Sequence, residues 1–593
     1  MKTPGLKYSL VVESYEKLEG HTGRLAITEV LAGLLKETPK QDLEMLVYLT
    51  QGKLRPDYEG IELGIAEKYA LRVLHTASGK SIEQVKRAYV DSGDIGTAAE
   101  RLLDESRQGA LFTEALTLKR VYDTLMDIAR MSGEGSTDSK LKELVNLIGD
   151  ASSKEAKYIL RTAMGVLRLG VADYTILDAC AVALLGEKAH RKSLERAYNV
   201  TSDLGYVVRL AAEEGLDGIR HVKVQVGKPI RPMLAERLPT AEEILEKMGG
   251  DVVMEYKLDG ERAQVHKMGD RVEIFSRRLE LITPTYPDVV KYTKEYVNGK
   301  KVILEGEVVA VNIETGEYLP FQELMHRRRK HDVEETMKRY PVAVNFFDVM
   351  FSDGRDFTQQ PYSARRKELE RIIEQNEFAR LVPAKRTSDP KEVERFMEEA
   401  ISQGGEGLML KDPRATYNAG ARGFGWIKLK REYRSELTDT IDLVIVGGIH
   451  GRGRRAGVFG AYLLAAYDEK RGAYPTITKV GTGFSDEDLR RFPKLLKPYE
   501  SEVKPPDVES ILVPDVWYRP KVVIETIASE ITLSPIYPAG LNSIREGSGL
   551  ALRFPKFTGK LRDEKGPEDA TTVKEVVEMY SLQLKKIQSK PGD

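Results

Sequence analysis

Residues 255–262 of this chain read EYKLDGER, and this stretch decides how the rest of the sequence is interpreted. An apolar run leads into it and an Asp-Gly pair follows as a turn signal, so we expect a strand that ends near Lys257. Because side chains alternate along a strand, Glu255 and Lys257 share one face, while Met254 lies on the opposite, apolar face. An amine and a carboxylate then point together toward a cleft, where the lysine is a candidate covalent nucleophile.

Two further stretches show the same pattern of paired charges on one face of a strand. Residues 302–309 (VILEGEVV) place Glu305 and Glu307 together, and residues 426–430 (WIKLK) place two lysines together. A solvent-facing side of an antiparallel sheet would alternate in the same way. Three such strands in a chain that also carries the lysine turn favour a functional site, because charges buried without partners are costly.

The bulk composition limits the class of protein. A length of 593 residues is too great for one core, and 41% hydrophobic with 31% charged residues is typical of a soluble globular protein. A single cysteine, Cys180, excludes a disulfide framework and a multi-cysteine zinc site. No signal core and no apolar run of membrane-spanning length is present, so we expect a cytoplasmic enzyme with no membrane partner.

The pattern along the chain predicts three domains. Residues 1–225 carry helical periodicity and predict an all-α domain. Residues 226–434 mix strands with helices, and the stretches 252–256, 263–266 and 272–275 predict a three-stranded meander in an α+β domain. Residues 435–593 contain strands near 442–446, 461–466 and 522–525 and a charged, helical tail, which predicts a small β-barrel domain.

The lysine stretch has the form K-x-D-G-x-R, which resembles the nucleotidyl-transfer signature of ATP-dependent DNA ligases and mRNA-capping enzymes. Further segments follow in the order found in the ligases. They are SRR at 276–278, EGE at 305–307, NFFDV at 345–349, GEGLM at 405–409, WIKLK at 426–430, LRFPKF at 552–557 and RDEKGPEDA at 562–570. The chain is similar to this family nearly end to end, and most similar to its archaeal replicative type.

This resemblance implies a fold and an activity. The three domains would be a helical DNA-binding domain, a nucleotidyltransferase (adenylation) domain and an OB-fold domain. The enzyme would use ATP as AMP donor, with Mg²⁺, and would seal nicks in double-stranded DNA in replication, recombination and repair. We expect it to work as a monomer.

The resemblance also assigns roles to individual residues. Lys257 would attack the α-phosphate of ATP and hold AMP as a phosphoramidate. Glu255 would accept a hydrogen bond near the adenine amino group, and Phe347 would stack on adenine, although an ordinary core phenylalanine is the alternative. Glu406, with Glu307, would hold the divalent cation. The other nucleotide-binding residues would contact ribose or phosphate: Arg262, Arg277, Glu307, Arg422, Lys428 and Lys430.

Two segments outside the nucleotide pocket complete these expectations. In the family the C-terminal barrel places its last motif on the β- and γ-phosphates, and Arg562 and Lys565 match the basic positions of the R-x-D-K pattern, with Glu564 in place of its aspartate. Residues 108–112 (QGALF) resemble a shortened sliding-clamp peptide, through Gln108, Leu111 and Phe112. A hydrophobe at a helix end is the alternative for that segment.

Four alternatives remain to be weighed against an ATP-dependent DNA ligase. A capping guanylyltransferase or an RNA ligase shares the lysine turn but has no need of a large helical domain before it. NAD-dependent ligases usually carry a cysteine zinc site, which one cysteine cannot form. A non-catalytic nick-binding scaffold would have no use for the charges of Lys257, Glu307, Glu406 and Lys428.

Overall fold

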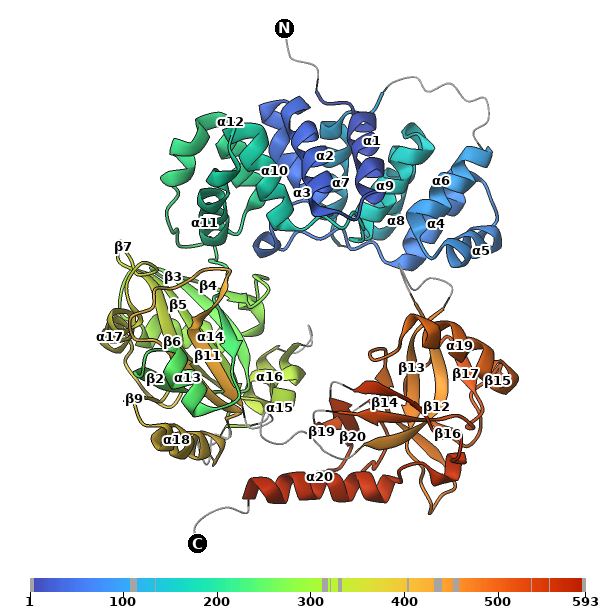
Figure 1. Ribbon diagram of the computed structural model, residues 1–593. Coiled ribbons are helices and arrows are strands. Elements are labelled where there is room, and N and C mark those ends of the chain that lie inside the picture. Colours follow the sequence, from blue (N-terminus) through green and yellow to red (C-terminus); the bar gives the residue numbers. More distant parts are fainter. Residues whose placement is uncertain are drawn as a thin grey trace. The chain divides into compact units, whose positions relative to one another are not determined.

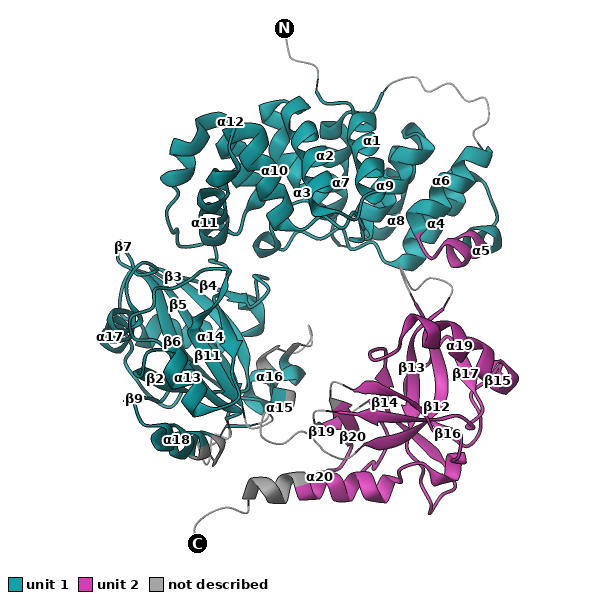
Figure 2. Cartoon of the chain, viewed as in Figure 1, with its two compact units in different colours: residues 1–86, 95–430 teal, residues 87–94, 431–593 magenta. Residues whose placement is uncertain are grey.

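A computed structural model gives the fold (Figure 1). The structure describes residues 5–106, 115–133, 135–311, 318–319, 321–328, 333–402, 405–430, 440–451, 458–528, 530–534, 536–553 and 555–588. The chain forms two compact units, the first of residues 1–86 and 95–430, the second of residues 87–94 and 431–593 (Figure 2). Each unit is described by itself.

The N-terminal part of the chain is helical, as its periodicity predicts. In α2 the predicted apolar face is buried at Ile27, Leu31 and Leu34, and α9 begins with a capping box between Ser152 and Glu155. The helices are α1 (Tyr8–Glu19), α2 (Arg24–Glu37), α3 (Leu43–Thr50), α4 (Glu67–Ser78), α5 (Ile82–Ser92), α6 (Ile95–Ser106), α7 (Leu118–Arg130), α8 (Ser136–Asp150), α9 (Ser153–Ala163), α10 (Asp173–Leu185), α11 (Arg191–Thr201) and α12 (Leu204–Arg220).

Two sheets follow the helices in the first unit. The first sheet has the order β1-β11-β10-β2-β9, with β1 (Leu234–Arg237), β2 (Val252–Lys257), β9 (Ala384–Thr387), β10 (Gly407–Lys411) and β11 (Arg422–Lys430). The second has the order β4-β3-β5-β6-β7, and β8 also pairs with β6. Its strands are β3 (Glu261–Met268), β4 (Arg271–Ser276), β5 (Lys301–Ala310), β6 (Val342–Ser352), β7 (Arg355–Asp356) and β8 (Ala379–Leu381).

The predicted three-stranded meander is wrong in one respect. The stretches 263–266 and 272–275 do form the β3–β4 hairpin, but β2 pairs with β9 and β10 in the other sheet. The turn after Lys257 therefore carries the chain from one sheet to the next. Only glycine fits at its centre, because a Cβ on Gly260 would lie 2.3 Å from the carbonyl oxygen of Val308 on β5.

Each sheet packs one face against helices through an apolar cluster. In the first sheet, Met254, Tyr256 and Leu258 pack with residues of α13 (Ala241–Lys247) and α18 (Pro390–Ser402). In the second, Leu304, Val308 and Phe346 pack with residues of α14 (Pro287–Tyr296) and α17 (Tyr362–Ile372). The short helices α15 (Phe321–Met325) and α16 (Val333–Arg339) lie between β5 and β6 in the sequence.

The second unit is rich in strands, which form a curled sheet with two buried apolar clusters. Its central strand β12 (Ile441–His450) pairs on one side with β13 (Phe459–Ala465), and on the other with β18 (Val523–Ile527) and β17 (Val516–Tyr518). The remaining elements are β14 (Tyr474–Val480), α19 (Asp486–Leu496), β15 (Glu500–Ser501), β16 (Val508–Glu509), β19 (Glu530–Ser534), β20 (Gly549–Arg553), β21 (Lys556–Leu561) and α20 (Val573–Gln588).

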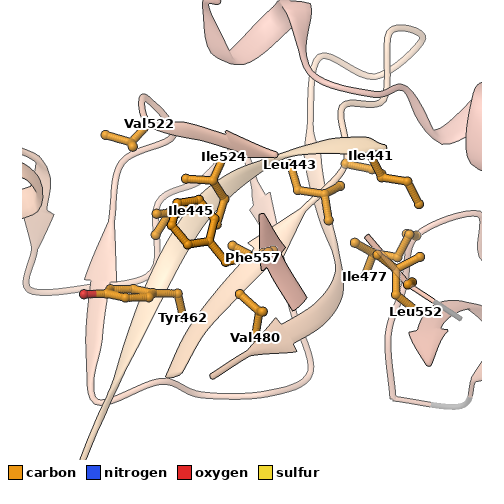
Figure 3. Packing of buried hydrophobic residues seen from close by; sticks show 14 of the residues in the cluster. Ile441, Leu443, Ile445, Tyr462, Ile477, Val480, Val522, Ile524, Leu552 and Phe557 are labelled. Carbon is orange, nitrogen blue, oxygen red and sulfur yellow. The ribbon is translucent and has the colours of Figure 1, made fainter. Parts of the chain in front are cut away.

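The core of the second unit explains why its strands were visible in the sequence. Ile441, Leu443 and Ile445 alternate along β12 and point into one cluster, where they meet Ile524 of β18 and Tyr462 of β13 (Figure 3). The strands expected near 442–446, 461–466 and 522–525 are therefore present, as is the helical tail. Among the described residues, no helix is both long and apolar enough to cross a lipid bilayer.

Candidate active site

A cavity of about 460 Å³ in the first unit is lined by strands of both sheets. The carboxylate and the amine predicted to share a face of β2 both reach it, whereas Met254, Tyr256 and Leu258 belong to the apolar cluster of this sheet. Eight of the predicted residues line this cavity: Glu255, Lys257, Arg262, Arg277, Glu307, Phe347, Arg422 and Lys428. The structure thus brings together residues that lie far apart in the sequence.

Lys257 lies at the end of β2 and is paired with the predicted metal ligand Glu406. The lysine Nζ is 2.5 Å from Glu406 Oε2, and Lys430 Nζ is 2.8 Å from the same oxygen. The backbone N–H of Glu406 also donates to the carbonyl of Lys257 at 2.8 Å, so the two residues are fixed by main chain and side chain together. Burial is the largest single effect and acts to raise the pKa of Glu406, but Lys257, Asp259 and Lys430 together hold that pKa well below its usual range.

Glu307 faces the cavity from β5, directly opposite Arg262 in the strand register. Burial raises the pKa of the Glu307 carboxyl to about 7, although Lys257 and Arg262 act in the opposite direction. The negative charges of Glu406 and Asp259 nearby add to the rise. Glu307 is therefore a carboxyl group that changes charge close to neutral pH and that would gain from a nearby cation or hydrogen-bond donor.

Arg262 lines the cavity, but its guanidinium is engaged by the protein. Two of its nitrogens donate to the carboxylate of buried Glu305 at 3.2 and 2.7 Å, and Nη1 donates to the carbonyl of Met233 at 2.8 Å. Tyr417 donates a further hydrogen bond to Glu305 at 2.9 Å. Arg262 thus connects β3 to Met233, which lies just before β1. A contact between Arg262 and ribose or phosphate would have to form in addition to these hydrogen bonds.

Phe347 reaches the cavity because β6 carries a bulge. Glu305 of β5 is opposite Asp348 and the next residue, Gly306, is opposite Phe346, so Phe347 is the extra residue. Its neighbour Phe346 points the other way and is fully buried in the opposite cluster. Phe347 is half-buried, with the Trp426 ring at 5.9 Å, and presents an aromatic surface to the cavity.

Cations gather at another part of the cavity wall. Lys428 and the exposed Arg422 reach it from β11, and Arg277 reaches it from the end of β4. Burial lowers the pKa of the Lys428 amine, and the charges of Lys257, Lys430, Arg422 and Arg277 lower it further. Such a cluster of like charges is suited to a polyanion such as a triphosphate. Arg422 is the first residue of β11 and pairs with Leu234 of β1.

Sequence reasoning missed a group of buried residues behind the cavity. Lys411 lines the cavity from β10 and forms an ion pair with Glu255, and Tyr362 of α17 donates a hydrogen bond to Glu255. Asp348 and Arg365, both fully buried, form a second pair nearby. The alternation in residues 407–411 (GLMLK), which places Met409 and Lys411 on one face, was a signal that could have identified Lys411.

The residues present fit a magnesium ion in part. Carboxylate oxygens are the ligands Mg²⁺ prefers, and Glu307 and Glu406 both act on Lys257 from beside the cavity. Among the described residues, no group of three or more His, Cys, Asp or Glu is arranged to hold a metal by itself. The site fits an ion that takes some of its ligands from phosphate and water, as Mg²⁺ does in nucleotide sites.

Arg562 and Lys565 lie in the second unit, where acidic residues hold them. Arg562 Nη1 is 3.1 Å from Asp442 and 3.0 Å from Glu525, and its Nε is 2.6 Å from Glu564. Lys565 Nζ is 2.6 Å from Asp442. Asp442 and Glu525 face each other across β12 and β18, and these two cations offset their repulsion. Gln108, Leu111 and Phe112, predicted to bind a sliding clamp, lie outside the described residues.

Two sheets that enclose a lysine, two carboxylates and a cluster of cations define a nucleotidyltransferase. Comparisons with known proteins give the family. A family model described as "ATP dependent DNA ligase domain" matches residues 232–430, "DNA ligase N terminus" matches residues 7–181, and "ATP dependent DNA ligase C terminal region" matches residues 455–565. The chain belongs to the ATP-dependent DNA ligases.

Individual relatives agree over nearly the whole chain. A protein named "DNA ligase 2" from Thermofilum pendens is 53% identical over 590 residues, which are 98% of each chain. A "DNA ligase" from Cenarchaeum symbiosum is 50% identical over 99% of this chain and all of its own length. The solved structure "Pmar-Lig_PreS3" superposes with a TM-score of 0.54 over 93% of this chain and 99% of its own, at 18% identity, and agrees in fold.

Proposed function

We propose that this ligase seals nicks in double-stranded DNA with ATP as the AMP donor, in replication, recombination and repair. The observation that carries the proposal is the position of Lys257, whose amine lies in a cavity beside Glu406, Lys428 and Glu307. A nucleophilic amine beside cations that stabilise phosphate charge is the arrangement that nucleotidyl transfer needs.

The first step is the formation of the lysine–AMP bond. The amine of Lys257 attacks the α-phosphorus of ATP, a P–N bond forms and pyrophosphate leaves, while the amine gives up its proton. Glu406 accepts hydrogen bonds from both Lys257 and Lys430, so it orients the nucleophile, and the released proton passes to solvent water. Lys428, Arg422 and Arg277 stabilise the charge on the phosphates.

The other roles follow from where each side chain meets the cavity. Glu255 accepts a hydrogen bond from the adenine amino group, Phe347 stacks on the base and Glu307 accepts one from a ribose hydroxyl. Glu307 and Glu406 are also the residues to hold Mg²⁺, which would neutralise phosphate charge. The AMP then passes to a 5′-phosphate at the nick, and attack by the 3′-hydroxyl releases AMP and forms the phosphodiester bond.

We assign these tasks to domains at residues 1–225, 226–434 and 435–593. The helical domain grips the duplex through backbone phosphates without sequence specificity, and Arg562 and Lys565 of the last domain act on the β- and γ-phosphates in the first step. We also propose that Gln108, Leu111 and Phe112 bind a sliding clamp and that the enzyme works as a monomer. Its DNA substrate would place it in the cytoplasm of an archaeal cell.

Sealing of a labelled nick by the purified full-length chain tests this function. We expect Mg²⁺ and ATP to convert a nicked duplex with a 5′-phosphate into a continuous strand, whereas a duplex with a 5′-hydroxyl nick stays unsealed. ATP, GTP and NAD are compared as donors. Binding of the nick without sealing by any donor would favour a scaffold. Labelling by GTP alone would favour a capping enzyme, and sealing of RNA alone would favour an RNA ligase.

A further inference from the structure

A buried ion pair lies at one wall of the nucleotide cavity, between Lys411 of β10 and Glu255 of β2. Lys411 Nζ is 2.6 Å from Glu255 Oε2, and the two side chains are 1% and 2% exposed. Both residues also line the cavity. A buried charge of this kind is tolerated only with close partners, because removal of one member leaves the other unpaired in a medium of low dielectric.

Lys411 is held from several sides. Its amine lies 4.5 Å from the centre of the Trp426 ring, 4.6 Å from that of Tyr362 and 4.9 Å from that of Phe347. It also donates a hydrogen bond to the backbone carbonyl of Phe347 at 3.0 Å. Aromatic faces attract a cation, and the attraction is greatest when the cation is desolvated. Lys411 therefore connects the predicted base-stacking residue with the predicted base-reading carboxylate.

The other oxygen of Glu255 faces α17. Tyr362 donates its hydroxyl proton to Oε1, and Arg366 Nη1 donates to the same oxygen at 3.3 Å. Farther away, Asp348 of β6 and Arg365 of α17 also act on Lys411. Among the described residues, the charged groups that face this carboxylate are thus Lys411 and Arg366.

We propose that Lys411 is a specificity-determining positioning residue, which holds the Glu255 carboxylate in place as a hydrogen-bond acceptor and so selects a nucleotide whose base carries an amino group at position 6. The proposal rests on the proposed function, in which Glu255 meets the adenine amino group. An ionised carboxylate can only accept hydrogen bonds, whereas a protonated one also has a donor. Adenine offers an N6 donor and guanine an O6 acceptor, so the charge of Glu255 decides between them.

The test measures which nucleotide labels the enzyme. Lys411→Met keeps the length and apolar bulk of the side chain but removes its charge, and Glu255→Gln/Lys411→Met removes both charges of the pair. Lys385→Met is the matched control, because Lys385 on neighbouring β9 forms an exposed ion pair with Glu392. Each full-length protein is incubated with ATP or GTP, radiolabelled in the α-phosphate, and Mg²⁺, without DNA. The ratio of kcat/KM values for ATP over GTP is recorded across pH.

We expect Lys411→Met to lower the ATP-over-GTP ratio by at least about tenfold, the effect of losing one discriminating hydrogen bond. Arg366 still donates to Oε1 of Glu255 in this variant, so the loss is expected from Oε2, the oxygen that Lys411 holds. The double variant should show a low ratio at every pH, because a glutamine amide offers both a donor and an acceptor. Lys385→Met should keep the wild-type ratio.

Three kinds of result would count against the proposals, each in a different way. A wild-type ratio at all pH values in Lys411→Met would overturn the proposal, because Lys411 would then only support the fold. If Lys411→Met shows no cooperative unfolding transition, and so is not folded, the ATP-over-GTP ratio of the double variant is used instead. A wild-type ratio in the double variant also overturns the proposal. If the wild type takes label from neither ATP nor GTP, the proposed function itself fails. If the wild type takes label from both equally well, the specificity proposal alone fails.

Discussion

Glu307 is the residue whose charge changes nearest to neutral pH in this site. Burial raises its pKa to about 7, so in the free enzyme it holds a proton below that pH and loses it above. We propose that Glu307 accepts a hydrogen bond from a ribose hydroxyl and holds a cation. Both roles need the ionised carboxylate. We therefore expect kcat/KM for DNA-free adenylylation to fall as the pH drops through about 7, since this constant reports groups of the free enzyme.

Glu307→Gln tests that assignment. The variant should be slower at every pH, and the fall through neutral pH should disappear because glutamine does not titrate in this range. The rates of labelling of the wild type and of Glu307→Gln, measured from about pH 5.5 to 9, give the two pH profiles. A variant that keeps the same break would show that another group causes it.

The residues that sequence reasoning found have two sources, because some follow from alternation within their own strand and the others from the family resemblance. Glu255 with Lys257, and Lys428 as the cavity-facing lysine of β11, lie where that pattern predicts. Lys411 was missed although alternation along β10 pointed to it, whereas Tyr362 was missed because its role depends on a contact between elements. Tyr362 bonds to Glu255 across 107 residues of sequence, and no local pattern announces such a contact.

At the scale of elements, the turn from β2 to β3 is the feature on which the site depends. It carries Lys257 on one side and Arg262 on the other, and it passes so close to β5 that a Cβ on Gly260 would lie 2.3 Å from the Val308 carbonyl oxygen and 2.9 Å from a Val309 methyl group. Neither atom is the end of a flexible side chain, so the turn itself would have to move.

Gly260→Ala should therefore lower the rate of adenylylation sharply and destabilise the protein by about 1–3 kcal/mol, as overpacking does. Labelling with ATP and the denaturant midpoint measure the two effects. Gly33→Ala is the opposite case, because Gly33 lies in α2 with no atom within 4 Å of its added Cβ. That variant should gain about 0.5–1 kcal/mol and label normally. Normal labelling by Gly260→Ala would contradict our account of the turn.

The sequence predicted strands and helices well but not their grouping into sheets. The β3–β4 hairpin has a short turn and is correctly predicted, whereas β2 was joined to it only because it comes next in the sequence. Its true partners, β9 and β10, begin at Ala384 and Gly407. Which strands pair over such distances depends on how the helices pack on the two sheets. The residue pattern of a single strand does not contain that information.

At the scale of the whole molecule, the proposed reaction needs residues of both units. Arg562 and Lys565 belong to the second unit, and there they are held by Asp442 and Glu525. Both cations are thereby fixed on one surface of the strand-rich domain, formed by β12, β18 and the segment after β21. If they act on the β- and γ-phosphates, they matter for the first step, in which pyrophosphate leaves, and not for the last.

Arg562→Gln should slow DNA-free adenylylation by about a hundredfold, the usual loss when one group that stabilises transition-state charge is removed. Sealing of a nick that already carries AMP should fall much less. Arg562→Lys keeps the charge beside Asp442 and Glu525, so it controls for their repulsion. Equal losses in both assays would show that Arg562 only holds the domain together.

Transfer of label from ATP to the full-length protein tests the central claim most directly. Wild type, Lys257→Ala and the exposed-site control Lys385→Met are each freed of bound AMP and incubated with Mg²⁺ and ATP radiolabelled in the α-phosphate, without DNA. We predict label on the wild type and the control, released by acid as expected for a phosphoramidate, and none on Lys257→Ala. Label on Lys257→Ala at the wild-type level would contradict the assignment of Lys257 as the nucleophile.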